Sequence, residues 1–439
     1  MSALASILKD EGHLVEGLDV NQYIFTEKQL KMKDIYIHSL DYDDFKEDFI
    51  YIIGHNFINH QIVTKLKEKN FITIEYNLFI KQYISTKNSV AICGTHGKTT
   101  TTGMLAKTLE NYNISYLIGD GTGKGNSNSS LFIFEACEYK NHFLAYKPNS
   151  IIITNIDYDH VDYFLSIEQY IESFNKFIFE AEVVFVNYKD LSKIKHKNII
   201  TYGLNINADY ACIDYKQDKF GIKGMLLYKG NKLFFELPIY GEHNLEHILA
   251  VLAYLDYYNY DIKKEIKNLA KFTGVKRRLT RTIINDDVFI DDYAHHPNEL
   301  IATISSVRAM YPSHKVIVFF KPDRYSRLIK FKDDFITALK QSDESFVLPL
   351  YESNVGYHDS RILCDQKNIF YLNDEKDIEN YDFSQKFLVF LMMSSKDMSS
   401  LMKAIVKIRE NEHWQWKYFH IKLRCRDDTC AFIENKGGY

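Results

Sequence analysis

The sequence predicts an α/β fold divided into three domains. Short apolar runs rich in β-branched and aromatic residues alternate with longer helical stretches, which is the pattern of mainly parallel sheets covered by helices. The length of 439 residues fits about three domains at roughly 150 residues each. Hydrophobic residues make up 46% of the chain and charged residues 26%, so the composition can supply buried cores.

The first domain is expected over residues 1–88. Residues 2–12 are predicted to form a helix that ends at Gly12, and the segment HLVEGLDV that follows is predicted to form a strand. Further strands are expected in FIYIIGHNF and FITIEYN. A mononucleotide-binding βαβ unit normally opens with a strand and a glycine-rich turn before its helix. Because this sequence opens with the helix, we expect a domain that is incomplete at its N-terminus.

The second domain is expected over residues 89–281 and the third over residues 282–439. The second opens with the strand, loop and helix of NSVAICGTHGKTT and continues with the strands LFIFEA and SIIITNID. The third contains the strands VFIDDY, KVIVFF and FLVFLMM. Such continuous apolar strands are typical of parallel sheets buried on both faces. The tail from about residue 411 holds both tryptophans and gives no functional prediction.

Composition and charge exclude several classes of protein. The formal net charge of −4 is unlike the basic footprint of a nucleic-acid-binding protein. No apolar run reaches the ~20 residues that a membrane-spanning helix needs, and no secretory signal is visible. The 6 cysteines are scattered without metal-ligand spacing, as is typical of reduced thiols. We therefore expect a cytoplasmic protein with no nucleic-acid or membrane partner.

A phosphate-binding loop is the strongest motif in the chain. In SVAICGTHGKTTTTGMLAKTLE, an apolar strand leads into a glycine-containing turn, and a threonine-rich helix follows. Glycines let backbone N–H groups approach phosphate oxygens, and a helix N-terminus adds positive potential. Lys98 would neutralise the β- and γ-phosphates, and the Thr99 hydroxyl would ligate Mg²⁺. The alternative, a chance Lys-Thr pair in an ordinary turn, is disfavoured by the strand before it and the helix after it.

Two candidate metal ligands follow the phosphate loop. Glu135 ends the apolar run LFIFE, and His160 belongs to the polar cluster after SIIITNID. The carboxyl ends of parallel strands are the ligand-binding edge of an α/β sheet, and Mg²⁺ prefers carboxylate and phosphate oxygens. Each residue alone could be a strand-end carboxylate or a packing histidine. Their place after a phosphate loop favours a role at the site.

These segments, in this order and spacing, resemble the Mur ligase family, and within it the UDP-N-acetylmuramate–L-alanine ligases. The central motifs are GTHGKTTTTG, FEACEYKNHFLAYKP and TNIDYDHVDYF, and the later ones are GEHNLEHILAVLA, GVKRRL and IDDYAHHPNEL. The resemblance covers roughly residues 1–410. It implies a Mur ligase architecture, with a truncated Rossmann-like domain for a UDP-sugar, a central P-loop ATPase domain and a C-terminal dinucleotide-fold domain.

The resemblance also implies an activity. Such enzymes use ATP and Mg²⁺ to phosphorylate the lactyl carboxylate of UDP-N-acetylmuramate, and the amine of L-alanine then attacks the acyl phosphate, in peptidoglycan precursor synthesis. UDP-N-acetylmuramate and L-alanine are therefore the expected substrates, and a monomer or homodimer is the expected state. By the same resemblance, Lys98 would hold the γ-phosphate, Thr99 and Glu135 one Mg²⁺, and His160 a second.

The remaining expected site residues come from the loop and from the later motifs. Nucleotide contacts are expected from Gly94, Thr95, His96, Gly97, Lys98, Thr99, Thr100, Asn244, Arg278 and Asp292. Arg324 and Arg327 would pair with a carboxylate of the substrate. The run Lys276-Arg277-Arg278 could instead be a solvated basic turn, although its place before VFIDDY favours a phosphate-facing role. His295 and His296 are expected to line the site.

The sequence departs from the family pattern at several positions. Asp323 stands where the family has a histidine, and an anion there should repel a carboxylate unless Lys321 compensates. Residues 394–397 (SSKD) replace a glycine-rich turn, and His247 replaces an asparagine. These departures motivate two alternatives to the alanine-adding activity. One is a Mur-type ligase of altered amino-acid specificity, and the other is a catalytically impaired paralogue that binds nucleotide.

Overall fold

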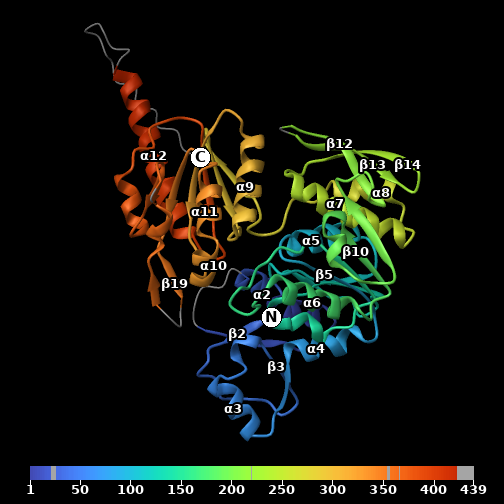
Figure 1. Ribbon diagram of the computed structural model, residues 1–439. Helices are drawn as coiled ribbons and strands as arrows, with labels where there is room; N and C mark the ends of the chain where they lie inside the picture. The colour runs from blue at the N-terminus through green and yellow to red at the C-terminus, as the bar shows by residue number, and fades with distance from the viewer. Residues whose placement is uncertain (21–25, 219, 353–355, 365, 423–439) are drawn as a thin grey trace, which may run out of the picture. The chain divides into compact units, whose positions relative to one another are not determined.

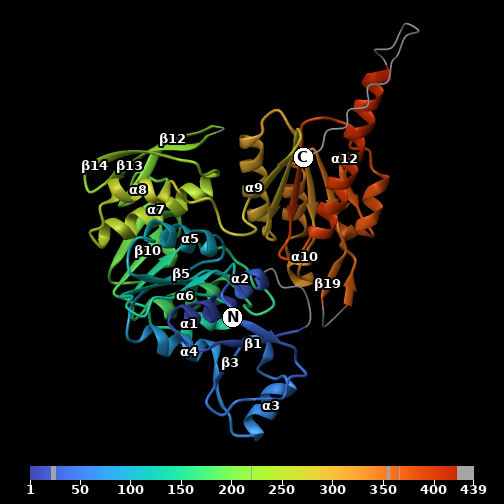
Figure 2. The same cartoon turned by 180° about the vertical axis from the view of Figure 1, so that it is seen from behind.

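The computed structural model describes residues 1–20, 26–218, 220–352, 356–364 and 366–422, without the side chains of residue 357 and of residues 411–422. The chain divides into two compact units (Figures 1 and 2). The first comprises Met1–Thr280 with Ile301–Pro312, and the second comprises Arg281–Leu300 with the chain from Ser313 onward. Part of the C-terminal tail, residues 423–439, lies outside the described residues.

The N-terminal part of the first unit forms two small parallel sheets. Strand β1 pairs with β2, and β3 pairs with β4. The predicted first helix is confirmed and ends at Asp10, and Gly12 follows with a left-handed φ of 91°. All three predicted strands are present. The elements are α1 (Ser2–Asp10), β1 (Glu16–Leu18), α2 (Glu27–Met32), β2 (Tyr36–His38), β3 (Ile50–Ile53), η1 (His55–Phe57), α3 (Gln61–Glu68), β4 (Ile72–Glu75) and α4 (Tyr76–Ile84).

A large sheet occupies the centre of the first unit, in the strand order β14-β13-β12-β11-β10-β9-β5-β8-β6-β7. Its strands are β5 (Asn88–Cys93), β6 (Ile114–Leu117), β7 (Gly123–Lys124), β8 (Leu131–Glu135), β9 (Ser150–Ile153), β10 (Val183–Asn187), β11 (Ile199–Gly203), β12 (Tyr210–Asp218), β13 (Gly221–Tyr228) and β14 (Asn231–Leu237). Its helices are α5 (Lys98–Thr108), η2 (Tyr139–Ala145), α6 (Ile167–Ile178), η3 (Tyr188–Lys193), α7 (Glu242–Tyr257) and α8 (Ile262–Leu269).

The order of these strands positions the candidate site. Strand β5 pairs in parallel with β8 on one side and with β9 on the other. The three predicted strands therefore end side by side, at the point where the chain changes from building one half of the sheet to building the other. Ligands bind at such a switch point in open α/β sheets. The antiparallel strands β12, β13 and β14 extend the far edge and were not predicted.

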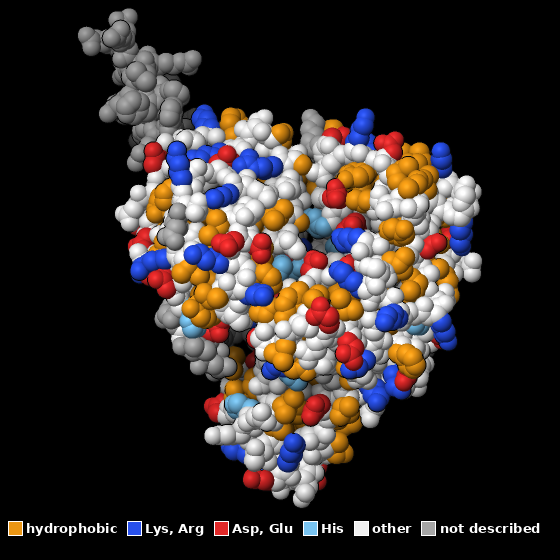
Figure 3. Space-filling model, in the orientation of Figure 1, with side chains coloured by type: hydrophobic (Ala, Val, Ile, Leu, Met, Phe, Trp, Pro, Cys, Tyr) orange, Lys and Arg blue, Asp and Glu red, His pale blue; other side chains and the backbone are white. Residues whose placement is uncertain are grey.

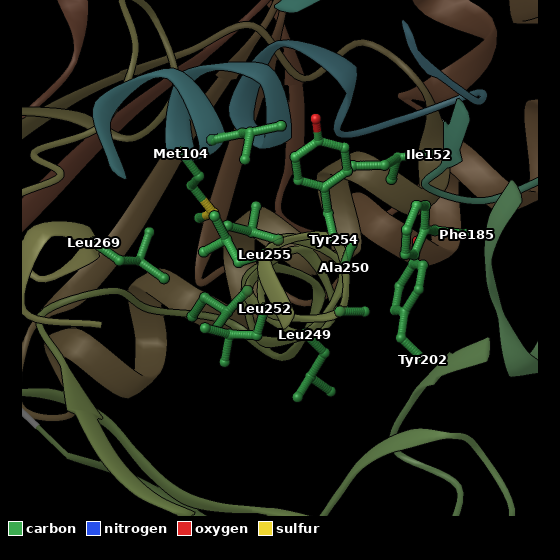
Figure 4. Close-up of a cluster of buried hydrophobic side chains, with 14 of the residues drawn as sticks. Met104, Ile152, Phe185, Tyr202, Leu249, Ala250, Leu252, Tyr254, Leu255 and Leu269 are labelled. Atoms are coloured by element: carbon green, nitrogen blue, oxygen red, sulfur yellow. The ribbon is translucent and has the colours of Figure 1, made fainter. Parts of the chain in front are cut away.

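Two hydrophobic cores cover the two faces of the central sheet. Along β5, Val90 and Ile92 belong to one core, and Ala91 and Cys93 belong to the other, as the two-residue period of a strand requires. The first core contains residues of α5, α7 and α8, and the second contains residues of α1, α4 and α6. Helix α7 is apolar on most of its sides, which is typical of a helix buried in a core, and Figure 4 shows its side chains packed together.

The second unit is built on a six-stranded sheet in the order β15-β16-β22-β17-β18-β21, among the residues that the structure describes. Strands β16, β22, β17 and β18 pair in parallel. Helix α9 (Pro297–Met310) begins in this unit, but its residues from Ile301 onward belong to the first unit. The other elements from Thr280 onward are β15 (Thr280–Ile284), β16 (Asp287–Asp292), β17 (Lys315–Phe320), α10 (Tyr325–Lys330), α11 (Lys332–Leu339), β18 (Glu344–Val347), β19 (Leu350–Glu352), β20 (Gly356–His358), η4 (Ser360–Leu363), β21 (Ile369–Tyr371), η5 (Glu375–Asn380), β22 (Leu388–Met393) and α12 (Ser399–Lys422).

Charged and apolar side chains are mixed on the surface of the protein (Figure 3). Basic and acidic side chains are interspersed with apolar ones on the face drawn in Figure 3. Among the described residues, no helix is both long enough and apolar enough to cross a membrane.

A buried ion pair joins helix α12 to strand β16 in the second unit. The Arg409 Nε donates to Asp287 Oδ2 at 2.7 Å, and its Nη atoms donate to the carbonyl oxygens of Phe383 and Gln385. Arg409 and Asp287 are both buried. The pair joins α12 to the start of β16 and to the loop before β22.

We expect Arg409→Ala to lower the free energy of unfolding of the second unit by about 3–5 kcal/mol, because it leaves the carboxylate of Asp287 buried without its cation. Urea denaturation measures this change. The matched control is Lys407→Ala, an exposed residue on the same helix, which should change stability by less than about 0.5 kcal/mol. Equal effects of the two variants would contradict the structural role of the pair.

Candidate active site

The phosphate loop connects β5 to α5 in a conformation that needs glycine. Gly94 has a φ of 131°, and Gly97, which begins α5, has a φ of 80°. A Cβ at Gly94 would overlap the Thr154 hydroxyl, and one at Gly97 would overlap the ring of His247. The loop therefore lies tightly against its neighbours, while the first N–H groups of α5 stay available at the helix N-terminus for an anion.

Polar groups at the end of β9 hold this loop in place. Thr95 N donates to the Asn155 carbonyl at 3.1 Å, and His96 N donates to Asn155 Oδ1 at 3.0 Å. Asn155 Nδ2 returns a hydrogen bond of 2.9 Å to the His96 carbonyl. The Thr95 hydroxyl donates to the Asp157 carbonyl at 2.7 Å. The polar residues at the end of SIIITNID, Asn155 and Asp157, thus fix the loop.

Lys98 forms an ion pair with a buried carboxylate that the sequence analysis did not select. Its Nζ lies 3.0 Å from Glu138 Oε2 and donates to the Gly94 carbonyl at 2.6 Å. Glu138 is completely buried. His160 Nε2 lies 3.2 Å from Glu138 Oε1. Lys98, Glu138 and His160 therefore form one group, and the second acid in FEACEY was the available signal for Glu138.

Charge coupling sets the protonation of this group. Burial by itself lowers the pKa of Lys98, but the facing Glu138 carboxylate outweighs it and raises that pKa well above its ordinary range. Burial by itself raises the pKa of Glu138, but Lys98 and the hydrogen bond to His160 hold it below its ordinary value. Both groups are therefore charged at neutral pH. The Nδ1 atom of His160 is buried and has no hydrogen-bond partner among the described residues.

Thr99 and Glu135 form a second group at the start of α5. The Thr99 hydroxyl donates to Glu135 Oε2 at 2.8 Å, and Gly119 N donates to the same oxygen at 3.0 Å. Adjacent oxygen ligands of an octahedral Mg²⁺ lie about 2.9 Å apart, given metal–oxygen distances of about 2.1 Å. The two oxygens thus fit the ion, with phosphate and water oxygens as further ligands. No cluster of three or more His, Cys, Asp or Glu suited to a metal occurs in the described part of the chain.

The N-terminus of α7 borders the phosphate loop. The His247 ring, which lies against Gly97, is buried, and its Nδ1 has no hydrogen-bond partner among the described residues. Burial first, then His243, Lys189 and Arg278, hold the pKa of His247 far below its ordinary value. This imidazole is therefore neutral. Asn244 Nδ2 donates to the Tyr240 carbonyl at 2.7 Å, which fixes the amide at the start of the helix.

A cavity of about 1010 Å³ opens beside the Thr99–Glu135 group. Gly119, Glu135, Cys137 and His142 are among the residues that line it, and most of the others belong to the N-terminal strands, helices and loops. His55 and His142 both line the cavity, and their Nε2 atoms lie 2.7 Å apart. Burial and then His55 lower the pKa of His142 to about 4. The cavity thus connects the candidate metal ligands with residues 1–88.

In the second unit, Asp292 ends β16, where its side chain accepts a hydrogen bond from Ala294 N at 2.9 Å. Glu299 Oε2 accepts hydrogen bonds from the backbone N–H groups of His295 at 3.0 Å and His296 at 3.2 Å. The motif DDYAHHPNEL therefore forms a strand end followed by a capped helix start, and the described residues place it at the carboxyl edge of that sheet.

The negative charge of Asp323 is paired with Arg327 and not with Lys321, the residue that was expected to compensate it. Arg327 Nη1 donates to Asp323 Oδ1 at 2.7 Å, and the Ser395 hydroxyl donates to Oδ2 at 3.2 Å. Lys321 instead lies 3.3 Å from Glu375. Burial by itself raises the pKa of Asp323, but His295, Arg327 and Arg324 hold it below its ordinary value. The two departures from the family pattern, Asp323 and Ser395, are thus joined by a hydrogen bond, and Asp323 also pairs with Arg327.

Two family models and several curated relatives match most of this chain. Residues 92–255 match the Mur ligase middle domain, and residues 277–405 match the Mur ligase, glutamate ligase domain. The UDP-N-acetylmuramate–L-alanine ligase of Streptococcus agalactiae is 37% identical over 361 residues, which cover 80% of this chain and 82% of that protein. The Lacticaseibacillus casei enzyme of the same name is 37% identical, with 80% and 83% covered.

Solved structures share the fold. The UDP-N-acetylmuramate–alanine ligase MurC of Thermotoga maritima has a TM-score of 0.80 at 23% identity and covers 94% of this chain and 96% of its own. The murein peptide ligase of Psychrobacter arcticus has a TM-score of 0.67 at 18% identity, with 93% and 96% covered.

The chain belongs to the Mur ligase family and is an ATP-dependent ligase that forms amide bonds. Within this family, its relatives at 37–38% identity are UDP-N-acetylmuramate–L-alanine ligases. The resemblance predicted from the motifs is therefore confirmed, and so is the predicted α/β class.

We expect Glu138→Gln to lower the free energy of unfolding of the first unit by about 3–5 kcal/mol, because the ammonium of Lys98, whose side chain is only 13% exposed, loses its anion. The wild-type carboxylate has a pKa below its ordinary value of 4.5, so its stabilising effect is present above pH 4.5 and is lost as the pH falls through the folded pKa. Urea titrations between pH 3 and 7 should show a shallower acid loss in the variant. An unchanged acid limb would contradict this assignment.

Proposed function

We propose that the chain joins L-alanine to the lactyl carboxylate of UDP-N-acetylmuramate, with ATP and Mg²⁺, in peptidoglycan precursor synthesis. The observation that carries this proposal is the pairing of Lys98 and Thr99 at the start of α5 with two acids, Glu138 and Glu135. That arrangement provides one cation for phosphate and one oxygen pair for a divalent metal. The names of the 37%-identical relatives supply the substrates.

In the proposed reaction, the protein mainly positions the substrates and neutralises their negative charges. The N–H groups at the start of α5 and the ammonium of Lys98 would hold the β- and γ-phosphates of ATP. Thr99 and Glu135 would hold Mg²⁺, which supplies charge neutralisation between the phosphates. Glu138 would keep Lys98 protonated and aimed at the loop. Because the loop is already fixed by Asn155, little rearrangement is needed for the nucleotide to bind.

The chemistry then follows in two steps. A carboxylate oxygen of the sugar substrate attacks the γ-phosphorus, the bond from that phosphorus to the bridging oxygen breaks, and ADP leaves. The resulting acyl phosphate is attacked at its carbonyl carbon by the neutral amine of alanine. The tetrahedral adduct expels inorganic phosphate, the amine loses its proton and the amide remains. Developing negative charge is stabilised by the surrounding cations in both steps.

The cavity beside Glu135 is the proposed site for the sugar nucleotide. Its connection to Glu135 and Cys137 would bring a carboxylate close to the metal ligands, and its remaining wall comes from residues 1–88, the expected UDP-sugar domain. His160 as a second metal site, Asn244 and Arg278 as nucleotide contacts, and the roles of Asp292, Arg324 and Arg327 remain predictions. The cytoplasm, which holds ATP and reduced thiols, is the proposed compartment.

The experiment that tests this function is phosphate release by the purified chain with ATP and Mg²⁺. Release that requires both UDP-N-acetylmuramate and L-alanine is the expected result. Phosphate release that needs UDP-N-acetylmuramate but does not respond to L-alanine would indicate that the enzyme uses a different amino acid. Nucleotide binding without release under any combination would contradict a ligase.

We expect Lys98→Ala to lower the rate of phosphate release by at least about 10²–10³-fold, the loss typical for one electrostatic contact to a transition state. Steady-state kinetics at saturating ATP measure the effect. Lys107→Ala, on the same helix and paired with Glu110, is the matched control and should keep the wild-type rate. Normal turnover by Lys98→Ala would mean that the phosphate loop is misassigned.

One observation favours a second candidate, a Mur-type ligase that adds a different amino acid. Arg327 is engaged by Asp323, so a substrate carboxylate would meet an arginine whose charge is already partly neutralised.

If Asp323 sets this preference, Asp323→His should change the ranking of amino acids in a panel assay, with L-alanine gaining in kcat/KM relative to the others by about tenfold or more. A panel in which wild type and variant both use only L-alanine would eliminate the second candidate.

A further inference from the structure

The segment after β9 holds the phosphate loop through two successive peptide groups. In the first group, the Asn155 carbonyl accepts a hydrogen bond from Thr95 N at 3.1 Å. In the second group, Asp157 N donates to the Thr95 hydroxyl oxygen at 2.9 Å. Ile156 lies between them and supplies the N–H of the first group and the C=O of the second. One side of each peptide group is therefore bonded to Thr95, and the other side points away from the loop.

Asp190 and Lys193 bind the far side of both peptide groups. Asp190 Oδ2 accepts a hydrogen bond from Ile156 N at 3.1 Å, and Lys193 Nζ donates to the Ile156 carbonyl at 2.7 Å. The two side chains also pair with each other, since Lys193 Nζ lies 2.6 Å from Asp190 Oδ1. A peptide group is planar, and in the trans form its N–H and C=O point in opposite directions. Fixing the far side of each group therefore fixes the direction of the side that meets Thr95.

The order of the strands brings this pair to Ile156. Strands β9 and β10 pair in parallel, so η3, which follows β10, lies beside residues 154–157, which follow β9. Asp190 and Lys193 are three positions apart in η3, and such residues lie on one side of a 3₁₀-helix. Asp190 is 2% exposed. The end of η3 is tied to α6, because Asn175 Nδ2 donates to the Lys193 carbonyl at 2.9 Å. The pair is thus itself held in place.

Burial makes the contacts to Ile156 costly to lose. Ile156 is completely buried and lies beyond the end of β9, and a buried peptide group without a partner is unfavourable. Without the pair, the segment would have to shift toward other partners, and Thr95 would shift with it. Thr95 also bears on the cation of the loop, since its carbonyl accepts a hydrogen bond from Lys98 Nζ at 3.1 Å. A continuous series of hydrogen bonds therefore connects η3 with Lys98.

We propose that Asp190 and Lys193 are positioning residues for ATP. They act through the two peptide groups around Ile156 to hold Thr95, and with it Lys98, in the arrangement that receives phosphate. This inference rests on the proposed function, in which the loop binds ATP. The alternative is an ion pair that only stabilises η3, which would affect the stability of the first unit and leave the use of ATP unchanged.

The kinetic test compares the KM for ATP with kcat, in phosphate release with Mg²⁺, UDP-N-acetylmuramate and L-alanine. Asp190→Ala should raise the KM for ATP about tenfold, because loop residues would have to be ordered on binding. At saturating ATP, kcat and the KM for the sugar nucleotide should change much less. Lys193→Met removes the donor to the Ile156 carbonyl and should shift the KM for ATP in the same direction.

Two further variants are the controls for this shift. Lys193→Arg keeps a cationic donor and should leave the KM for ATP within about twofold of the wild-type value. Lys197→Ala changes an exposed lysine in the loop before β11 and should also keep the wild-type KM. Equal KM values for Lys193→Met and Lys193→Arg would overturn the proposal.

Amide hydrogen exchange gives a readout that does not depend on activity. In Asp190→Ala, the N–H groups of Thr95 and His96 should exchange about tenfold faster than in the wild type. Exchange in β13, in the same sheet, is the internal reference for global unfolding. Unchanged exchange at Thr95 relative to β13, or faster exchange without a higher KM for ATP, would overturn the proposal. If the wild type releases no phosphate, the proposed function fails, and the exchange comparison still decides whether the pair holds the loop.

Discussion

One buried carboxylate, that of Glu138, organises the proposed nucleotide site. It lies completely inside the protein and is tolerable there because Lys98 and His160 both face it. The ion pair in turn keeps the ammonium charged and holds it over the Gly94 and Thr95 carbonyls. The cation that we propose to hold phosphate is thus positioned before any ligand arrives, as preorganised electrostatic catalysis requires.

Much of the first unit was predictable because its signals are local. An apolar strand, two glycines and Lys-Thr at a helix start can form few other structures, so the loop and its flanking elements follow from the residues themselves. Glu135 could be identified because it ends a strand. Glu138 was missed although it is the second acid of FEACEY, since its role depends on a distant lysine and histidine that only the sheet order brings to it. The neutral, packed state of His247 is likewise a consequence of burial.

In the second unit too, local patterns were predictable from the sequence, whereas contacts between distant segments were not. Three of its parallel strands, β16, β17 and β22, are apolar runs and were predicted, but the consequence of Asp323 was not. Charge alone suggested repulsion, with Lys321 as the compensating group. The fold instead places Arg327 one helical turn away and brings Ser395 across from the β22 end. A sequence read one segment at a time cannot show that residues 323 and 395 fit each other, because 72 positions separate them.

Hydrogen bonds between the phosphate loop and the end of β9 determine whether the loop loses its conformational entropy on folding or on ligand binding. Four hydrogen bonds from Asn155 and Asp157 hold Thr95 and His96, and ordering each residue of a free loop costs roughly 1–2 kcal/mol. That cost falls on folding and not on association with a nucleotide. If the nucleotide binds here as proposed, binding starts from a loop with few conformations left to lose, so its affinity would be governed by contacts and desolvation and would depend little on chain ordering.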